Sequence, residues 1–401
     1  MLPFGRLSAR RQPDHHARAR RHIVLLGVIC GGLGLVCLFM LGPALRVLTA
    51  YRPPETGRTI AAPIRNPHAE RVVLVVVSHL ATDTMSDRGD PWRLVELRRR
   101  AAEGARGTVR AVQPSGDAPT WAALLSGAGP QQSGIVDDAA GGPLPIPTLF
   151  DQAAIPGLPT AVVAGPAAWK ARSGLAMPDQ LVTARSNATA GTAAVDLLRA
   201  GTEQLVVVLL DASRGPAIRL DEIAARVDSQ IGAIAAVLNP ARDTLIVTGD
   251  HGVLPDGSSG GHERTVLDVP LVLWGRAVAP GELGPVDQRD IAPTVAALLG
   301  LPYSGAGGQP LLDALDLDDE MRAREMVALL DARVAVPAAD ASTSARMEST
   351  RLLRASRDSL GKGDWARARA EAEQGLSALI LPEAPPRYVS STWAWGAGLP
   401  L

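Results

Sequence analysis

The feature that most constrains the fold is the run of six apolar residues inside Arg71–Ser78, RVVLVVVS. Apolar residues without polar alternation are typical of a strand buried on both faces, as in a parallel sheet. Further segments that are largely apolar follow at residues 109–112, 160–164, 205–210, 245–247 and 271–274. Because helical or loop segments separate these runs, we predict an α/β fold: a mainly parallel sheet with helices on both faces.

Helical patterns lie between the strands and after them. Residues 92–104 place Leu94, Leu97 and Ala101 on one helical face, and residues 117–126 form a second candidate helix that ends at Gly127. Residues 318–334 and 349–380 are rich in Arg, Glu and Ala, so we expect a helical C-terminal region over 314–401. These helices either pack on the α/β domain or extend from it.

The first 45 residues predict a membrane anchor. Ile23–Leu45 contains no charged residue and reaches the length of about 20 residues that a membrane span requires. Arginines crowd the preceding segment 1–22, which the positive-inside rule places in the cytoplasm. The alternative, a cleaved signal peptide, has a shorter apolar run and a small-residue cleavage site. We therefore expect a single-pass protein of the cell membrane whose main domain lies outside the cytoplasm.

Composition limits the remaining classes. Residues 46–70 contain Pro and Arg without periodicity and predict a linker before an α/β domain over 71–313. The formal net charge of −1 gives no reason to expect a nucleic-acid partner. Cys30 and Cys37 both lie in the predicted span, so the globular part has neither a disulfide nor a thiol nucleophile.

The candidate site follows the predicted strand 245–247, in the stretch TLIVTGDHGVLPDGSSGGHERTVLDVP. In an open α/β sheet, ligands bind beyond the carboxyl ends of the strands, which is where Asp250 and His251 fall. A carboxylate and the imidazoles of His251 and His262 are ligands that Zn²⁺ accepts. The alternative is a turn with two surface histidines.

The motifs GDHG, GGHE, VPLVLWG and DIAPTVAALLGLP occur in this order between Thr244 and Pro302. They resemble the C-terminal half of the alkaline phosphatase superfamily, and within it the type I phosphodiesterase/nucleotide pyrophosphatase branch. The resemblance implies a phosphate ester held between two divalent metal ions while a Thr or Ser attacks phosphorus. It assigns Asp250 and His251 to one ion and His262 to the other, and we expect zinc, as one ion or two.

Three positions depart from the pattern that this resemblance implies. Ser78 stands where the first strand supplies a metal-binding Asp, and Asp117 stands at the nucleophile position. Asp211 is retained, but Gly215 replaces the His that follows it by four residues. Two complete metal sites cannot be assembled from the remaining ligands, whereas Asp117, Asp250 and His251 supply the three that a catalytic zinc commonly has.

Two residues near the site have alternative interpretations. Asp117 could ligate a metal or attack phosphorus, but it could also only cap the helix that begins there. His79 could replace a lost ligand, or it could simply face solvent at the end of its strand.

Two functions of different classes follow. The first is a membrane-anchored extracytoplasmic hydrolase or transferase that acts on phosphate esters with the help of a metal. The second is a catalytically inactive relative that keeps the fold as a binding or assembly module and contacts a protein partner through its C-terminal helices. Fold alone cannot separate the two, because function resides in the site.

Overall fold

The computed structural model of the chain describes residues 24–37, 39–40, 60, 64–80, 94–138, 143–170, 172, 174–211, 220–254, 258–336 and 341–379. The chain divides into two units, one made of Met1–Arg52 with Arg387–Leu401 and the other of Pro53–Pro386. In the first unit, residues 24–37 and 39–40 are helical and exposed. None of the helices in the described ranges combines the length and the apolar character needed to cross a membrane. The rest of the predicted span lies outside those ranges.

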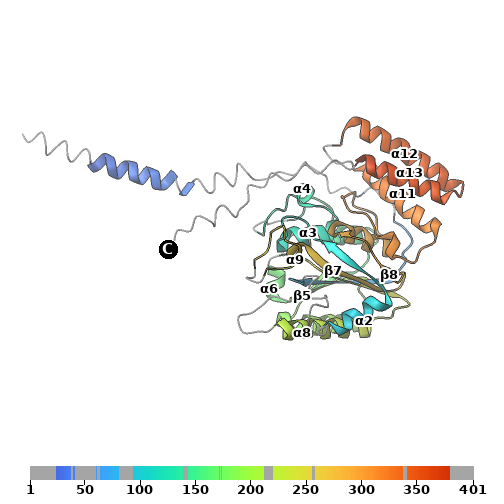
Figure 1. Cartoon of the computed structure of the whole chain (residues 1–401), viewed down its shortest axis with the longest axis horizontal. Coiled ribbons are helices and arrows are strands. Elements are labelled where there is room, and N and C mark those ends of the chain that lie inside the picture. Colours follow the sequence, from blue (N-terminus) through green and yellow to red (C-terminus); the bar gives the residue numbers. More distant parts are fainter. Residues whose placement is uncertain are drawn as a thin grey trace, which may run out of the picture. The chain divides into compact units, whose positions relative to one another are not determined.

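The second unit is built on a nine-stranded sheet, which confirms the predicted α/β class (Figure 1). Its order is β4-β3-β5-β1-β6-β7-β2-β8, and β9 also pairs with β2. The strands are β1 Arg71–Ser78, β2 Ala105–Arg110, β3 Thr160–Ala164, β4 Gln180–Thr183, β5 Leu205–Asp211, β6 Asp243–Gly249, β7 Asp268–Gly275, β8 Gly281–Glu282 and β9 Val286–Asp287. Strand β7 runs antiparallel to both neighbours, whereas the other described pairings are parallel.

The apolar run of β1 is buried on both faces, as its sequence predicts. Val72, Leu74 and Val76 belong to one hydrophobic cluster, and the intervening valines belong to another on the opposite face. Helices α2 Val95–Glu103, α7 Ala190–Ala200 and α8 Leu220–Val237 cover the second cluster. Helices α3 Asp117–Ser126, α5 Leu149–Ala154 and α10 Ile291–Leu298 cover the first. Figure 1 shows α2 and α8 on one side of the sheet and α3 on the other.

The C-terminal helices are α11 Asp319–Ala335, α12 Thr343–Gly361 and α13 Trp365–Leu379. Gly375 of α13 lies so close to α11 that an added Cβ would stand 2.7 Å from a methyl carbon of Leu330. Ser349 of α12 donates to the carbonyl oxygen of Gly375 at 2.8 Å. Leu353 of α12 and Leu376 of α13 belong to the same hydrophobic cluster as β1 and α3. The three helices therefore pack on the α/β core.

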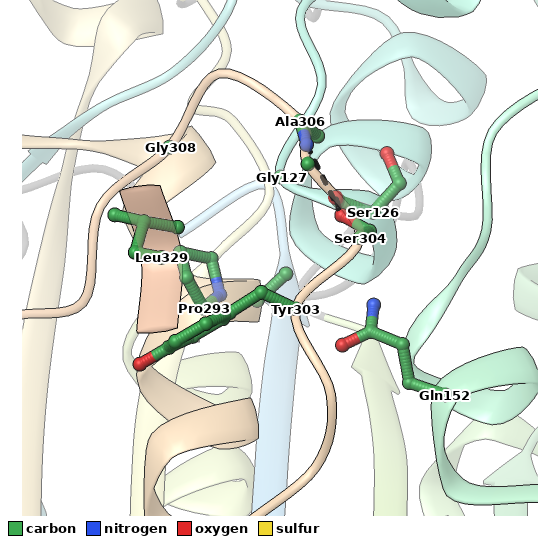
Figure 2. A pocket seen from close by; sticks show the side chains of 11 residues that line it. Ser126, Gly127, Gln152, Pro293, Tyr303, Ser304, Ala306, Gly308 and Leu329 are labelled. Atoms are coloured by element: carbon green, nitrogen blue, oxygen red, sulfur yellow. Dashed lines mark hydrogen bonds between the residues drawn. The ribbon is translucent and has the colours of Figure 1, made fainter. Parts of the chain in front are cut away.

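The remaining described helices are short: α4 Pro130–Ser133, α6 Pro166–Lys170 and α9 Arg264–Leu267, with 3₁₀ turns at 187–189, 288–290 and 312–314. A small pocket lies where the C-terminal end of α3 meets α5, α10 and α11 (Figure 2). Ser304 crosses it by donating to the carbonyl oxygen of Ser126 at 3.1 Å, and its Oγ accepts from the backbone of Ala306 at 3.3 Å. This pocket is at the opposite end of α3 from the residues that the motifs single out.

Candidate active site

The carboxyl ends of three neighbouring strands bring the predicted residues together. Ser78 at the end of β1 is level with Asp211 at the end of β5, and Val77 is level with Gly249 at the end of β6. Gly249 is required here because a Cβ would stand 2.7 Å from the carbonyl oxygen of Leu80. The close approach lets the chain after β1 reach Asp250, whose Oδ1 accepts from the backbone N–H of His79 at 3.0 Å.

Asp117 approaches the same point from the start of α3. It is the first residue of the helix, directly after the N-cap residue Gly116. The carboxylate of Asp138 caps the helix instead, since its Oδ1 accepts from the backbone N–H of Ala118 at 2.8 Å. The interpretation of Asp117 as only a helix cap is therefore wrong, and its carboxylate is directed at the strand ends.

A buried arginine that the sequence analysis does not single out lies between these residues. Arg172 follows α6 and is 1% exposed. Its Nη2 is within hydrogen-bond distance of three oxygens: Ser78 Oγ at 2.9 Å, Asp117 Oδ1 at 2.9 Å and Asp250 Oδ2 at 2.5 Å. Its Nη1 donates to the carbonyl oxygen of Ala168 at 2.8 Å. The guanidinium thus links β1, the start of α3 and the end of β6.

The electrostatics of Asp250 and His251 follow from burial among opposite charges. Burial raises the pKa of Asp250, but the positive charges of His251, Arg172 and His79 outweigh it and hold the pKa at about 2. Burial lowers the pKa of His251, but the carboxylates of Asp250 and Asp117 raise it to about 9. Burial also raises the pKa of Asp117, while the hydrogen bond from His251 and the charge of Arg172 bring it below its ordinary value.

The orientation of the His251 ring is set by the backbone. Its Nδ1 is 2.8 Å from the carbonyl oxygen of Gly252, which can only accept, so Nδ1 carries a hydrogen. Its Nε2 is therefore directed at Asp117 Oδ1, at 3.3 Å. A backbone carbonyl that fixes one ring nitrogen and leaves the other for a ligand is the usual support of a metal-binding histidine.

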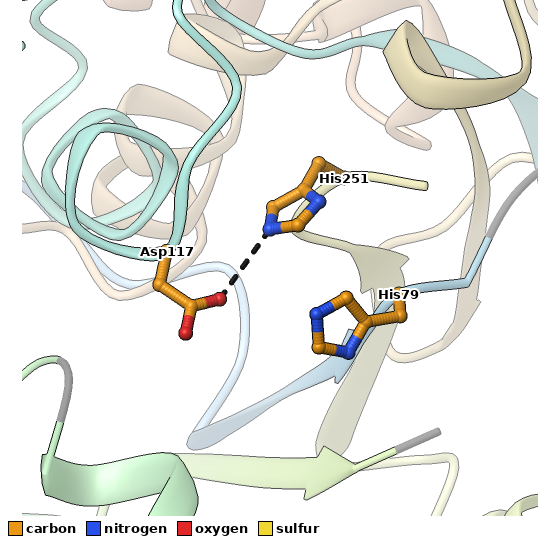
Figure 3. Close-up of side chains that lie close together, drawn as sticks. All are labelled: His79, Asp117 and His251. Atoms are coloured by element: carbon orange, nitrogen blue, oxygen red, sulfur yellow. Dashed lines mark hydrogen bonds and ion pairs between the residues drawn. The ribbon is translucent and has the colours of Figure 1, made fainter. Parts of the chain in front are cut away.

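His79 completes the cluster. Its φ of 66° lies in the left-handed region, where a non-glycine residue is strained by about 1 kcal/mol or more. Its ring meets that of His251 edge-on at 5.1 Å, and its buried Nδ1 has no hydrogen-bond partner among the described residues. Figure 3 shows His79, Asp117 and His251 directed toward one another. Each offers one ligand atom, and these atoms lie within 4.8 Å of one another.

The chain is similar to known proteins over part of its length. No family model matches the chain. The phosphopentomutase of Symbiobacterium thermophilum is 40% identical over 82 residues, and that of Methylobacterium radiotolerans is 40% identical over 81 residues. These matches cover 20% of this chain and 20% and 19% of the two relatives, so the chain spans about a fifth of the length of these curated relatives.

Two solved structures share the fold over a larger part of the chain. Human ectonucleotide pyrophosphatase/phosphodiesterase 5 superposes with a TM-score of 0.50 at 12% identity, covering 62% of this chain and 100% of that one. A 2-O GAG sulfatase superposes with a TM-score of 0.50 at 13% identity, covering 62% of this chain and 74% of that one. The chain shares the fold of these two proteins, which agrees with the predicted resemblance to the alkaline phosphatase superfamily. The phosphodiesterase branch within that superfamily stays a prediction.

The predicted resemblance implies metal ions, and the residues present fit one ion better than two. His79, Asp117 and His251 form a group of the size and chemistry that a catalytic metal needs. Asp250, by contrast, has both oxygens occupied: Oδ1 accepts from the backbone N–H groups of His79 and His251 at 3.0 and 2.6 Å, and Oδ2 contacts Arg172. Asp250 contacts the cluster through these hydrogen bonds, and the three side chains that lie close enough to share an ion are His79, Asp117 and His251.

The other predicted ligands lie outside this group. His262 is exposed and joins no set of three metal-ligand side chains in the described ranges. Asp211 is half-buried, with Oδ1 at 3.9 Å from Nδ1 of His79. Gly215 falls outside the described residues, and Ser78 contacts Arg172. Of the two residues outside the predicted set, His79 could be selected because it directly follows a predicted strand. Arg172 has no such signal.

Proposed function

We propose that this chain is a membrane-anchored, extracytoplasmic domain that hydrolyses or transfers phosphate esters with one divalent metal ion. The observation that carries the proposal is the convergence of His79, Asp117 and His251 at the strand ends. The names of the similar proteins support the class of reaction: a phosphopentomutase, a nucleotide pyrophosphatase/phosphodiesterase and a sulfatase all act on phosphate or sulfate esters. We choose zinc as the ion because two imidazoles and one carboxylate suit it.

The chain's own residues would perform three tasks. Asp117 is ionised because its pKa lies below the ordinary value, so it can bind the ion or attack phosphorus. His251 holds its Nδ1 hydrogen on Gly252, which keeps Nε2 in place beside Asp117. Arg172 restrains Asp117 through its Nη2 contact at 2.9 Å. The bound ion would supply Lewis-acid polarisation of a phosphoryl oxygen.

Metal content tests the centre and separates it from the one that the sequence motifs predict. Full-length protein purified without chelator is expected to hold one zinc per chain. His251→Ala and His79→Asn should each lose that zinc and the rise in melting temperature that it confers, since a ligand of the folded state stabilises it. Asn tolerates the left-handed backbone of residue 79, so strain is not a confounding factor.

His262→Ala distinguishes the two centres because His262 is exposed and apart from the group. It should keep the zinc and the melting temperature of the unmodified chain. Equal loss of zinc from the His262 and His251 variants would contradict this group of ligands and favour the metal centre that the sequence motifs imply. If the unmodified protein holds no zinc, the proposed metal centre is wrong.

Hydrolysis of a generic phosphodiester and a generic phosphomonoester tests the activity. Asp117→Asn keeps the shape of the side chain but removes its charge, so it should reduce turnover by about 10⁴-fold if Asp117 attacks phosphorus. Full turnover in this variant would show that the Asp117 carboxylate is needed neither as a nucleophile nor as a metal ligand.

The second candidate is the inactive binding or assembly module. It is favoured by one observation, that Arg172 occupies Asp250 and leaves no complete two-metal centre. Bound zinc without turnover on either substrate class would support this candidate and direct attention to a protein partner of α11, α12 and α13. Extraction of the full-length chain from membranes by alkali without detergent would contradict the anchor proposed for residues 23–45.

A further inference from the structure

We propose that the guanidinium of Arg172 takes the position of one metal ion of the superfamily's two-ion centre, so that this chain carries a fixed organic cation there and binds at most one metal. The inference deepens the proposed function and rests on it for the role of the remaining ion. It concerns a residue that none of the sequence motifs contains.

Arg172 makes several of the contacts that the lost ion would make. The resemblance assigns the positions of Ser78, Asp117 and Asp250 to the metal-binding residues and the nucleophile. All three now meet one nitrogen atom, Nη2, at 2.9, 2.9 and 2.5 Å. Zinc binds carboxylate oxygens at about 2.0–2.2 Å, so an ion held by these groups would need the space that this nitrogen fills.

Both oxygens of Asp250 are engaged while Arg172 is in place. The side chain is fully buried, its Oδ1 accepts two backbone N–H groups, and its Oδ2 contacts the guanidinium. A buried carboxylate needs a compensating charge, and in the described structure Arg172 brings a positive charge into direct contact with Oδ2. Arg172 therefore supplies to Asp250 the positive charge that a metal ion would otherwise supply.

The residue at position 78 is consistent with the replacement of a metal ion by Arg172. A guanidinium carries less positive charge than a divalent ion, so it is better matched by fewer carboxylates. The hydroxyl of Ser78 still contacts Nη2 without adding negative charge. The missing Asp at residue 78 and the arginine at residue 172 are thus complementary parts of one change.

The position of the guanidinium is fixed by its environment. Nη1 donates to the carbonyl oxygen of Ala168 in α6, and the side chain is almost completely buried. Nε is buried without a hydrogen-bond partner among the described residues, so the Nη1 and Nη2 contacts determine where the group sits. Since Arg172 acts on Asp117 and Asp250, it is a positioning residue.

The test is whether removing the arginine creates a metal site. Zinc alone is titrated into the full-length chain, Arg172→Ala and the double variant S78D/R172A, with bound zinc and melting temperature as readouts. Arg172→Ala is expected to bind one zinc more than the unmodified chain. Its melting temperature should fall in chelator and rise by about 5 °C or more with saturating zinc. Adding the Ser78→Asp carboxylate should tighten the new site about tenfold or more.

Two control variants test whether the change in zinc binding is specific to the position and the charge of Arg172. Arg110→Ala also removes an arginine paired with a strand-end aspartate, but that pair is exposed, so zinc binding should not change. Arg172→Lys keeps a cation and should keep the zinc content of the unmodified chain. A zinc content that is the same in Arg172→Ala and the unmodified chain, without stabilisation by zinc, would overturn the inference and leave the proposed one-metal centre standing.

The remaining outcomes also decide whether the inference holds. No zinc in the unmodified chain with one in Arg172→Ala supports the inference and refutes the proposed centre of His79, Asp117 and His251. A second tightly bound zinc in the unmodified chain overturns the inference without any variant. If Arg172→Ala folds only when zinc is present, the replacement is supported, and failure to fold with zinc overturns it.

Discussion

Glu325→Ala is expected to lower the free energy of unfolding by about 3–5 kcal/mol, because it leaves a buried arginine without its carboxylate. Glu325 lies on α11 and is 3% exposed. Its Oε2 accepts from Arg65 Nη1 and from the hydroxyl of Tyr303, the latter at 2.5 Å, and its Oε1 is 3.3 Å from His68 Nε2. The side chain thus ties the segment before β1 to the C-terminal helices.

The other groups that contact the Arg65 guanidinium in the described structure are uncharged. Its Nη2 donates to the carbonyl oxygens of Ala296, at 3.1 Å, and Leu301, and its guanidinium stacks 3.8 Å above the ring of Tyr303. These groups hold the arginine in place but carry no negative charge. The measurement is urea unfolding of the full-length chain in detergent, with chelator present so that metal binding does not contribute.

Glu320→Ala is the matched control. Glu320 lies one turn earlier on the same helix and pairs with Arg324, but that pair is exposed and should contribute about 1 kcal/mol or less. Equal losses in the Glu320 and Glu325 variants would show that the buried cluster contributes nothing beyond helix propensity.

Local patterns in the sequence are sufficient for most of the core. The apolar run of β1 predicts a strand buried on both faces, and the bounds of α3 and β3 match the predicted ranges. Strand β2 is less well predicted: it spans Ala105–Arg110 instead of 109–112. Its sequence ARGTVR is polar, and pairing with the antiparallel β7 determines its extent more than its own residues do.

The site is less predictable because tertiary contacts decide it. Asp250 and His251 could be placed at a strand end from the motif alone. The replacement of a metal by Arg172 could not, because it depends on how the turn after α6 meets three distant segments. His262 matches the motif yet lies exposed, since sequence spacing does not report where a loop folds.

Asp250→Ala in chelator is expected to lower the free energy of unfolding by about 3–5 kcal/mol, a loss as large as that of Glu325→Ala. Asp250 is fully buried, and its removal takes a charge partner from Arg172 and an acceptor from the backbone N–H groups of His79 and His251. Asp268→Ala is the control. Asp268 is the first residue of β7, but its partners Arg110 and Arg264 are exposed, so its loss should cost about 1 kcal/mol or less.

A double-mutant cycle separates the two parts of that loss. Arg172→Met removes the cation but keeps much of the buried apolar volume, and on its own it leaves Asp250 buried without its partner. Together, the two substitutions leave neither charge uncompensated at Oδ2, so their combined cost should be below the sum of the single costs by about 1–3 kcal/mol. Additive costs would mean that the backbone hydrogen bonds hold Asp250. A large coupling would show that the ion pair makes this strand end stable without a metal.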